Sequence, residues 1–182
     1  MSSQTTPALM IVGFGPDEPG IAAAMLAPLK TSGLTITDSA MTILRGVFTY
    51  NILVEGATDT AALAATYEAL AVEKGWSILC RPVVVSSEKL VASDTPVMIS
   101  IAGADQVGIT LAFAQLLAQQ GVNITDLYAK QCANKAGTVY ILMIEADLPA
   151  SLDRDAFEDA LIAQGEALQV EVTYQPIDVL AL

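Results

Sequence analysis

Hydrophobic and polar residues recur along the chain with two different periods, and these periods predict alternating strands and helices. The run "ALMIVGF" at 8–14 is almost entirely apolar, as in a central strand. Apolar residues then recur every four positions from Ile21 to Leu29, which predicts a helix over 19–32. In "VFTYNILVE", 47–55, every second residue belongs to an apolar set, the pattern of a strand with one buried face. The chain therefore begins with a strand, a helix and further strands.

The rest of the first half completes a β-α-β-β-α-β order. We expect strands at 34–45 and 76–85 and a second helix at 59–74. Gly33 and Gly75 directly follow the two predicted helices, where glycine is favoured. Two prolines add detail. Pro28 lies deep in the first helix and is expected to kink or shorten its last turn. Pro82 predicts that its strand lies at a sheet edge, or that the strand starts there.

The second half repeats the first. Residues 15–38 align without a gap with residues 103–126 at an offset of 88, and ten of the 24 positions are identical. Further on, "FTYNILVE" matches "TVYILMIE" at an offset of 90, which predicts two extra residues in a loop of the second copy. We expect its strands at 97–103, 122–132, 138–146 and 168–175, and its helices at 107–120 and 153–164, the last capped by Asp153.

Two units of this order predict an α+β fold of two ferredoxin-like βαββαβ repeats. Each repeat is expected to have a four-stranded antiparallel sheet with helices on one face. The predicted domains are 1–85 and 96–182, joined by a polar linker at 86–95. One sheet of this kind leaves a face and edges open, which favours pairing with another copy, as in a homodimer.

The net charge of the chain argues against some functions and indicates none by itself. The chain has 20 acidic residues, 8 basic residues and no histidine, for a net charge of −12. Nucleic-acid binding depends on lysine and arginine at phosphates, so we expect no direct contact with DNA or RNA. The sequence has no recognisable signal peptide or apolar run of membrane-spanning length, and Cys80 and Cys132 fit no metal pattern. These features favour a cytoplasmic protein with reduced thiols, no membrane contact, no cofactor and no metal.

The repeated turn has the chemistry of an amino-acid site. Gly15 is expected to permit a tight turn, and Gly20 to let the backbone approach another group closely. The start of the following helix offers free N–H groups to a carboxylate. Asp17, and Asp105 in the second copy, would either cap the helix or hold a ligand ammonium.

A second repeated segment opens the next strand, as "GLTITD" at 33–38 and "GVNITD" at 121–126. Asn123 offers both donors and acceptors to a ligand, and Thr35 is its poorer counterpart. The alternative is that both residues serve only the strand edge.

These two motifs, in this order, resemble those of ACT domains. A pair of such domains without a catalytic domain resembles the glycine cleavage system transcriptional repressor family. The resemblance implies a regulator that senses a small amino acid such as glycine or serine and acts through a protein partner, for instance a transcription factor of glycine or one-carbon metabolism. It also implies that each turn meets the strand start of another copy. The ligand-binding residues it implies are Gly15, Asp17, Gly20 and Ile21 with Asn123, Ile124 and Thr125, and reciprocally Gly103, Asp105, Gly108 and Ile109 with Thr35, Ile36 and Thr37.

The chain departs from the family pattern in ways that keep an alternative open. Glu18 and Gln106 stand where the family commonly has a basic residue, Val107 replaces the proline, and the histidine often found nearby is absent. An ACT-fold interaction or oligomerisation module that binds no ligand fits these changes. An enzyme does not fit, because no histidine, phosphate loop or metal cluster supplies catalysis.

Overall fold

The computed structural model describes residues 5–56, 59–86, 96–104, 106–134 and 137–177. The chain divides into two compact units, Met1–Lys89 and Leu90–Leu182. The predicted linker, 86–95, begins at the last residue of a strand, and 87–95 lie outside the described residues.

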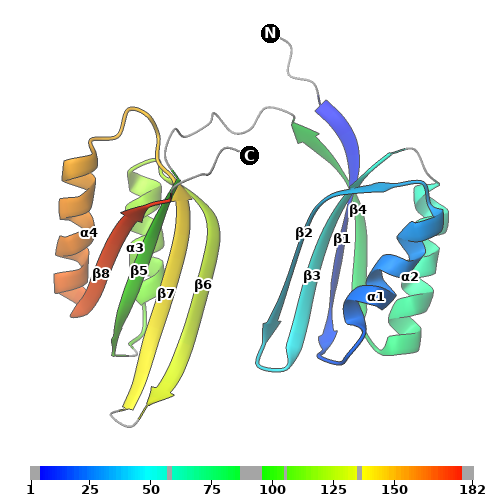
Figure 1. Cartoon of the computed structure of the whole chain (residues 1–182), viewed down its shortest axis with the longest axis horizontal. Coiled ribbons are helices and arrows are strands. Elements are labelled where there is room, and N and C mark those ends of the chain that lie inside the picture. Colours follow the sequence, from blue (N-terminus) through cyan, green and yellow to red (C-terminus); the bar gives the residue numbers. More distant parts are fainter. Residues whose placement is uncertain (1–4, 57–58, 87–95, 105, 135–136, 178–182) are drawn as a thin grey trace. The chain divides into compact units, whose positions relative to one another are not determined.

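The first unit is a four-stranded antiparallel sheet with helices on one face (Figure 1). The strand order is β2-β3-β1-β4, so β4, which contains Pro82, is an edge strand as predicted. Its elements are β1 (Thr5–Pro16), α1 (Ile21–Leu26), the 3₁₀ helix η1 (Ala27–Thr31), β2 (Thr35–Leu44), β3 (Val47–Glu55), α2 (Thr60–Lys74) and β4 (Ser77–Ser86).

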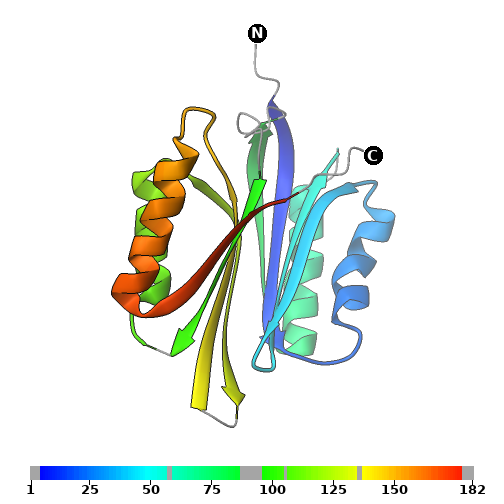
Figure 2. The same ribbon diagram turned by 60° about the vertical axis from the view of Figure 1, so that its left-hand side comes forward.

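The second unit has the same architecture, with strand order β6-β7-β5-β8, and Figure 2 shows its two helices on one face of its sheet. Its elements are β5 (Pro96–Ala104), α3 (Ile109–Gln119), β6 (Asn123–Asn134), β7 (Gly137–Asp147), α4 (Arg154–Leu168) and β8 (Val170–Pro176). The predicted fold, two ferredoxin-like repeats, is confirmed.

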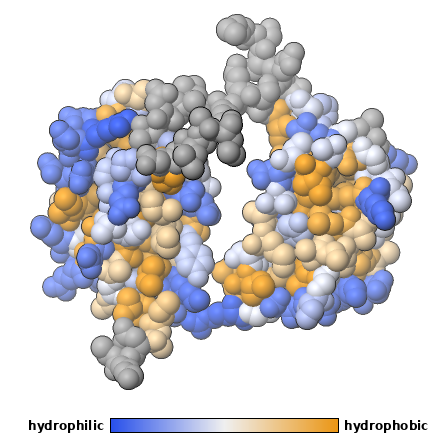
Figure 3. Space-filling view, in the orientation of Figure 1, coloured by the Kyte–Doolittle hydropathy of each residue, from blue (hydrophilic) through white to orange (hydrophobic). Residues whose placement is uncertain are grey.

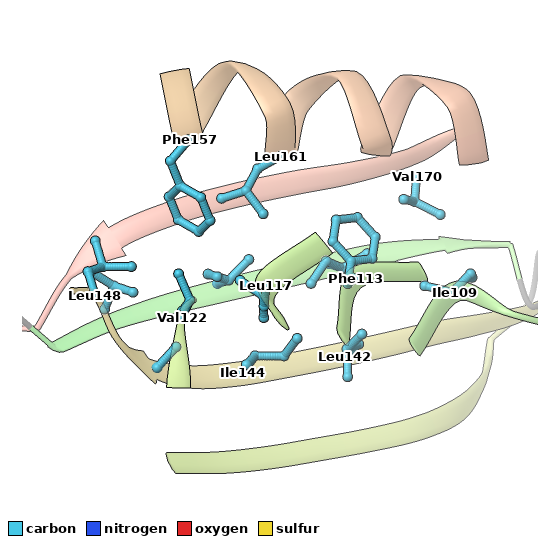
Figure 4. Packing of buried hydrophobic residues seen from close by; sticks show 14 residues of the cluster. Ile109, Phe113, Leu117, Val122, Leu142, Ile144, Leu148, Phe157, Leu161 and Val170 are labelled. Carbon is cyan, nitrogen blue, oxygen red and sulfur yellow. The ribbon is translucent and has the colours of Figure 1, made fainter. Parts of the chain in front are cut away.

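Each unit has its own hydrophobic core between its sheet and its helices. In β3 the alternation is clean, since Phe48, Ile52 and Val54 are fully buried. The core of the second unit is built around Phe113, Leu117, Ile144, Phe157 and Leu161 (Figure 4). The predicted buried faces therefore form the cores.

The two long helices begin at residues that the sequence indicates, whereas α4 ends at Leu168, beyond the predicted end at 164. Asp59 caps α2 by accepting from the amides of Ala61 and Ala62, at 3.0 and 3.1 Å. Asp153 caps α4 by accepting from the amide of Ala156 at 3.2 Å, which confirms that prediction.

Pro28 shortens the first helix, also as expected. The α-helix ends at Leu26 and continues only as η1, in which Pro28 lies near the start. Proline has no amide hydrogen, so it cannot donate to the carbonyl four residues earlier. The second copy has Leu116 at this position, and α3 runs without interruption over 11 residues.

The sheet register corrects the predicted offset in the second half of the repeat. Ala8 pairs with Glu55, and Pro96, 88 residues later than Ala8, pairs with Asp147. Glu55 and Asp147 are 92 residues apart, so the offset of 90 was wrong. The extra residues lie in the strands and not in a loop, because β6 and β7 are each two residues longer than β2 and β3. A two-residue slip keeps every side chain on its face, so alternation in the sequence could not reveal it.

The first unit leaves apolar side chains exposed. Phe14, Leu44, Val47 and Leu79 are 45–55% exposed, and apolar residues gather on the visible face of this unit in Figure 3.

Within the described residues, no helix has the length and apolar character needed to cross a membrane.

Candidate functional site

The first repeated turn links β1 to α1 at the surface. Residues 17–20 are exposed, and the amide of Asp17 donates to the carbonyl of Gly46, 2.9 Å away, which ties the turn to the β2–β3 hairpin. The helix is capped by Gly20 rather than by Asp17, so the capping role suggested for Asp17 was wrong. Among the described residues, no side chain caps this helix start. Its first N–H groups therefore have no side-chain acceptor among these residues.

The two glycines of the turn are required for different physical reasons, and the turn-forming role predicted for Gly15 was wrong. Gly20 adopts φ 98° with open space around it, so its backbone conformation is what requires glycine. Gly15 lies within β1, where an added Cβ would be 2.6 Å from Cδ1 of Trp76. Gly15 is thus the position of close approach. Gly108 and Gly103 repeat these roles, with φ 98° at Gly108 and Val170 against Gly103.

The second repeated turn lines a pocket. A pocket lies at the start of α3, lined by Gln106, Val107, Gly108, Ile109, Thr110, Leu111 and Tyr140. The hydroxyl groups of Thr110 and Tyr140 are hydrogen-bonded to each other, and Nε2 of Gln106 donates to the carbonyl of Leu168. Asp105 lies outside the described residues.

Tyr140, Thr110 and Gln106 are residues that the sequence motifs did not single out as contributors. Tyr140 reaches the helix start from β7, which is distant in the chain. Its alternation on β7 places it on the inner face, but nothing in the sequence indicates which helix residue it meets. The isoleucines of both turns are core residues, with Ile21 2% and Ile109 1% exposed, so only their backbone can meet a ligand.

The second motif starts β2 and β6. Thr35 and Asn123 are the first residues of these strands and are exposed. Both strands contain an irregularity in register at the same place, between Ile36 and Asp38 and between Ile124 and Asp126. At the first of these, the hydroxyl of Thr37 donates to the carbonyl of Leu53 at 3.3 Å. The repeated "ITD" therefore encodes a β-bulge in each unit.

Within one unit, the turn and the strand start are not brought together. Thr35 pairs with Glu55, and Glu55 pairs with Ala8 in the first half of β1. Asp17 follows the other end of β1, after Pro16. Each unit by itself holds the two motifs at opposite ends of its sheet.

A comparison with known families settles the assignment. The model of the ACT domain family matches residues 8–80. A curated relative, the UPF0237 protein of Methanosarcina acetivorans, is 34% identical over 82 residues, which are 45% of this chain and 86% of the relative. The chain belongs to the ACT domain family. A second UPF0237 protein, from Methanosarcina mazei, is 33% identical over 81 residues and matches 85% of that relative.

Two solved structures share the fold of this ACT protein over nearly its whole length. One, provisionally named a glycine cleavage system transcriptional repressor, has a TM-score of 0.74 at 21% identity and covers 97% of this chain and 100% of its own. The other, an unknown protein from Galdieria sulphuraria, has a TM-score of 0.76 at 23% identity and covers 96% of this chain and 100% of its own. The tandem ACT-like fold therefore extends over nearly the whole chain.

Proposed function

We propose that this chain is a non-catalytic regulator that binds a small amino acid at its repeated turns and thereby controls a partner protein. The observation that carries the proposal is a strand–turn–helix unit that occurs twice, with a glycine and no side-chain cap at each helix start among the described residues. Free N–H groups and the helix dipole favour a carboxylate there. The exposed carboxylate of Asp17 suits the ligand's ammonium group.

Each turn is proposed to share its ligand with the strand start of the other unit. In this proposal Gly15, Asp17 and Gly20 bind the ligand with Asn123 to Thr125, and Gly103, Asp105 and Gly108 bind it with Thr35 to Thr37. The separation of the two motifs within each unit supports this arrangement, because neither unit alone joins them. Asn123 can hydrogen-bond either charged group of an amino acid, so its site is expected to bind more tightly.

The partner is proposed to be a protein, such as a transcription factor of glycine or one-carbon metabolism. The net charge of −12 argues against direct contact with nucleic acid. One of the two proteins with the same fold carries the name of a glycine cleavage system transcriptional repressor. That name belongs to the other protein, and it supplies the pathway to search first.

Ligand-dependent stabilisation tests the proposal. Purified full-length protein is heated with each common amino acid, glycine and serine included, and a saturable, stereoselective rise in Tm is expected for one or two of them. A ligand that binds only the folded state stabilises it by about 2.7 kcal/mol at 100 times its Kd. The double variant Asp17→Ala, Asn123→Ala is expected to lose the larger part of this rise, which the tighter site contributes, because the reciprocal site keeps its residues.

A matched double variant controls for general effects of the substitutions. Asp159→Ala with Asn51→Ala removes the same residue types from exposed positions outside both motifs, and it should keep the full rise. A rise that survives undiminished in the Asp17 and Asn123 variant means that the ligand does not bind at this site. No rise for any amino acid at millimolar concentration supports the alternative, an interaction module without a ligand.

A further inference from the structure

A second pocket lies in the first unit, at the end of β1 opposite to the turn. Its lining comes from segments spread along the sequence of this unit: Pro7, Ala8, Leu9, Leu34, Val54, Gly56, Thr60, Pro82, Val83 and Val84. Of the described residues that line it, Thr60 alone has a polar side chain, and none is charged. Such a lining favours an apolar occupant.

The second unit shows what fills the equivalent place. Glu55 pairs with Ala8, and Asp147 pairs with Pro96, the residue equivalent to Ala8. Glu55 and Asp147 are therefore equivalent, and the residues that follow them, Gly56 and Leu148, are counterparts. Leu148 is 2% exposed and packs near Val122 at one end of the core (Figure 4). Leu152, just before the cap Asp153, packs against the same core. The loop before α4 thus contributes two leucines to the core.

The first unit has no such leucines. Its loop between β3 and α2 reads "GATD" at 56–59, without a large apolar side chain. Gly56 itself cannot supply one easily, because its φ is 130° and an added Cβ would lie 3.3 Å from the carbonyl oxygen of Gly33.

Larger side chains around the pocket fill only part of the space that the two loop leucines fill in the second unit. Three core residues of the first unit exceed their counterparts in size: Leu9, Leu34 and Val54 replace Val97, Val122 and Ala146. Together their additional carbons amount to about one leucine side chain. Gly56, the counterpart of Leu148, lines the pocket, so the pocket lies next to the position from which Leu148 enters the core of the second unit.

We propose that this pocket is a second binding site, which takes a short branched aliphatic group carried by a small molecule. The group would occupy the place that a leucine of the loop fills in the second unit, and the polar part of the molecule would lie at the open mouth beside Thr60. The site is separate from the repeated turns and does not depend on the function proposed for them.

Methyl NMR of the full-length protein with 3-methylbutan-1-ol as the probe tests this site. Saturable shifts are expected for the methyl groups of Leu9, Leu34 and Val54, with no matching shifts for Leu142 and Ile144 in the core of the second unit. Glycerol, which lacks the aliphatic group, should cause none. Absence of saturation up to about 50 mM probe, or equal shifts in both cores, would overturn the proposal.

Two variants locate the binding. Val84 is 72% exposed and lines the pocket, so Val84→Trp should block it and weaken probe binding at least about tenfold. The matched control Val72→Trp, at an 81% exposed position of α2, should leave binding unchanged. Unchanged binding in Val84→Trp contradicts the proposal.

A loop exchange provides an independent check. Replacing "EGATD" at 55–59 with "DLPASLD", the sequence at 147–153, should fill the pocket and abolish binding. If this chimera does not fold, the Val84→Trp comparison still decides. The Asp17 and Asn123 double variant should bind the probe normally, which separates failure of this site from failure of the amino-acid site.

Discussion

Gly15 and Gly20 bracket the same turn, yet the chain needs glycine at them for different physical reasons. At Gly15 the obstacle is the ring of Trp76, which packs edge-on against Phe48 with ring centroids 5.0 Å apart. At Gly20 the requirement is a left-handed backbone conformation at the helix start. The sequence predicted that both glycines matter but wrongly assigned Gly15 to the turn, and the close approach predicted at Gly20 stays a prediction. The decisive neighbour of Gly15, Trp76, lies far away in the chain, and no local pattern points to it.

This difference predicts unequal effects of substitution. Gly15→Ala forces the Trp76 ring to move and should lower the free energy of unfolding of the first unit by about 1–3 kcal/mol. Gly20→Asn meets no atom within 4 Å, and asparagine tolerates this conformation, so it should cost less than about 1 kcal/mol. Urea unfolding followed by the fluorescence of Trp76, the single tryptophan, measures both. Equal losses in the two variants would show that the ring is not the obstacle.

At the scale of elements, the two repeats differ in how their two helices contact each other. In the first unit Pro28 ends α1 early, and the hydroxyl of Tyr67 on α2 donates to the carbonyl of Met25 near that end at 2.7 Å. In the second unit Leu116 lets α3 continue, and the residue equivalent to Tyr67 is Leu161, which packs without a polar group. Tyrosine thus occurs where the neighbouring helix is interrupted.

Tyr67→Phe should therefore weaken the first unit in a pH-dependent way. Loss of the buried hydrogen bond should lower the free energy of unfolding by about 1–3 kcal/mol at neutral pH. Burial raises the pKa of Tyr67 well above its ordinary value of 10.0, so the folded state keeps the phenol protonated where the unfolded chain loses the proton. The stabilisation is complete below pH 10 and declines as the pH rises beyond it. The difference in unfolding free energy between the parent protein and the Tyr67→Phe variant should then shrink above pH 10.

Urea unfolding at several pH values, again followed by Trp76, measures this difference. Tyr128→Phe is the control, since Tyr128 is 42% exposed on the second unit and its loss should leave this signal unchanged. A Tyr67→Phe difference that stays constant up to pH 11 would contradict the ionisation argument.

The helices and strands also show how far the sequence predicts the fold. Alternation and capping residues placed nearly all elements, and the proline in β4 indicated an edge strand. Strand register was beyond this reasoning, because a slip by two residues leaves the buried face of β7 intact. The contact between Thr110 and Tyr140 was missed for a related reason: periodicity gives the face of an element and not its neighbour across the core. The amino-acid site stays a prediction, since it joins motifs that each unit holds apart.

At the scale of the whole molecule, net charge limits whether this ACT protein can contact DNA directly. The chain has an excess of 12 negative charges, and the electrostatic potential that they produce extends beyond the residues that carry them. The net charge does not depend on how the units are arranged. DNA is itself densely negative, and proteins that bind it gain affinity by releasing counterions with lysine and arginine. The 8 basic residues of this chain are outnumbered by 20 acidic ones, so repulsion should dominate.

We therefore expect no binding of the purified protein to a short DNA duplex, with or without amino acids. Fluorescence anisotropy of a labelled duplex, with protein up to about 0.1 mM at about 150 mM salt, measures this, since non-specific DNA binders are detected in that range. The salt dependence is the sharper criterion. Lower salt strengthens binding by a basic surface, whereas here it should strengthen repulsion. Anisotropy that rises as the salt concentration falls would reveal a local basic contact and remove the need for a protein partner. A flat response leaves an indirect route, in which the amino acid changes how this chain binds another protein.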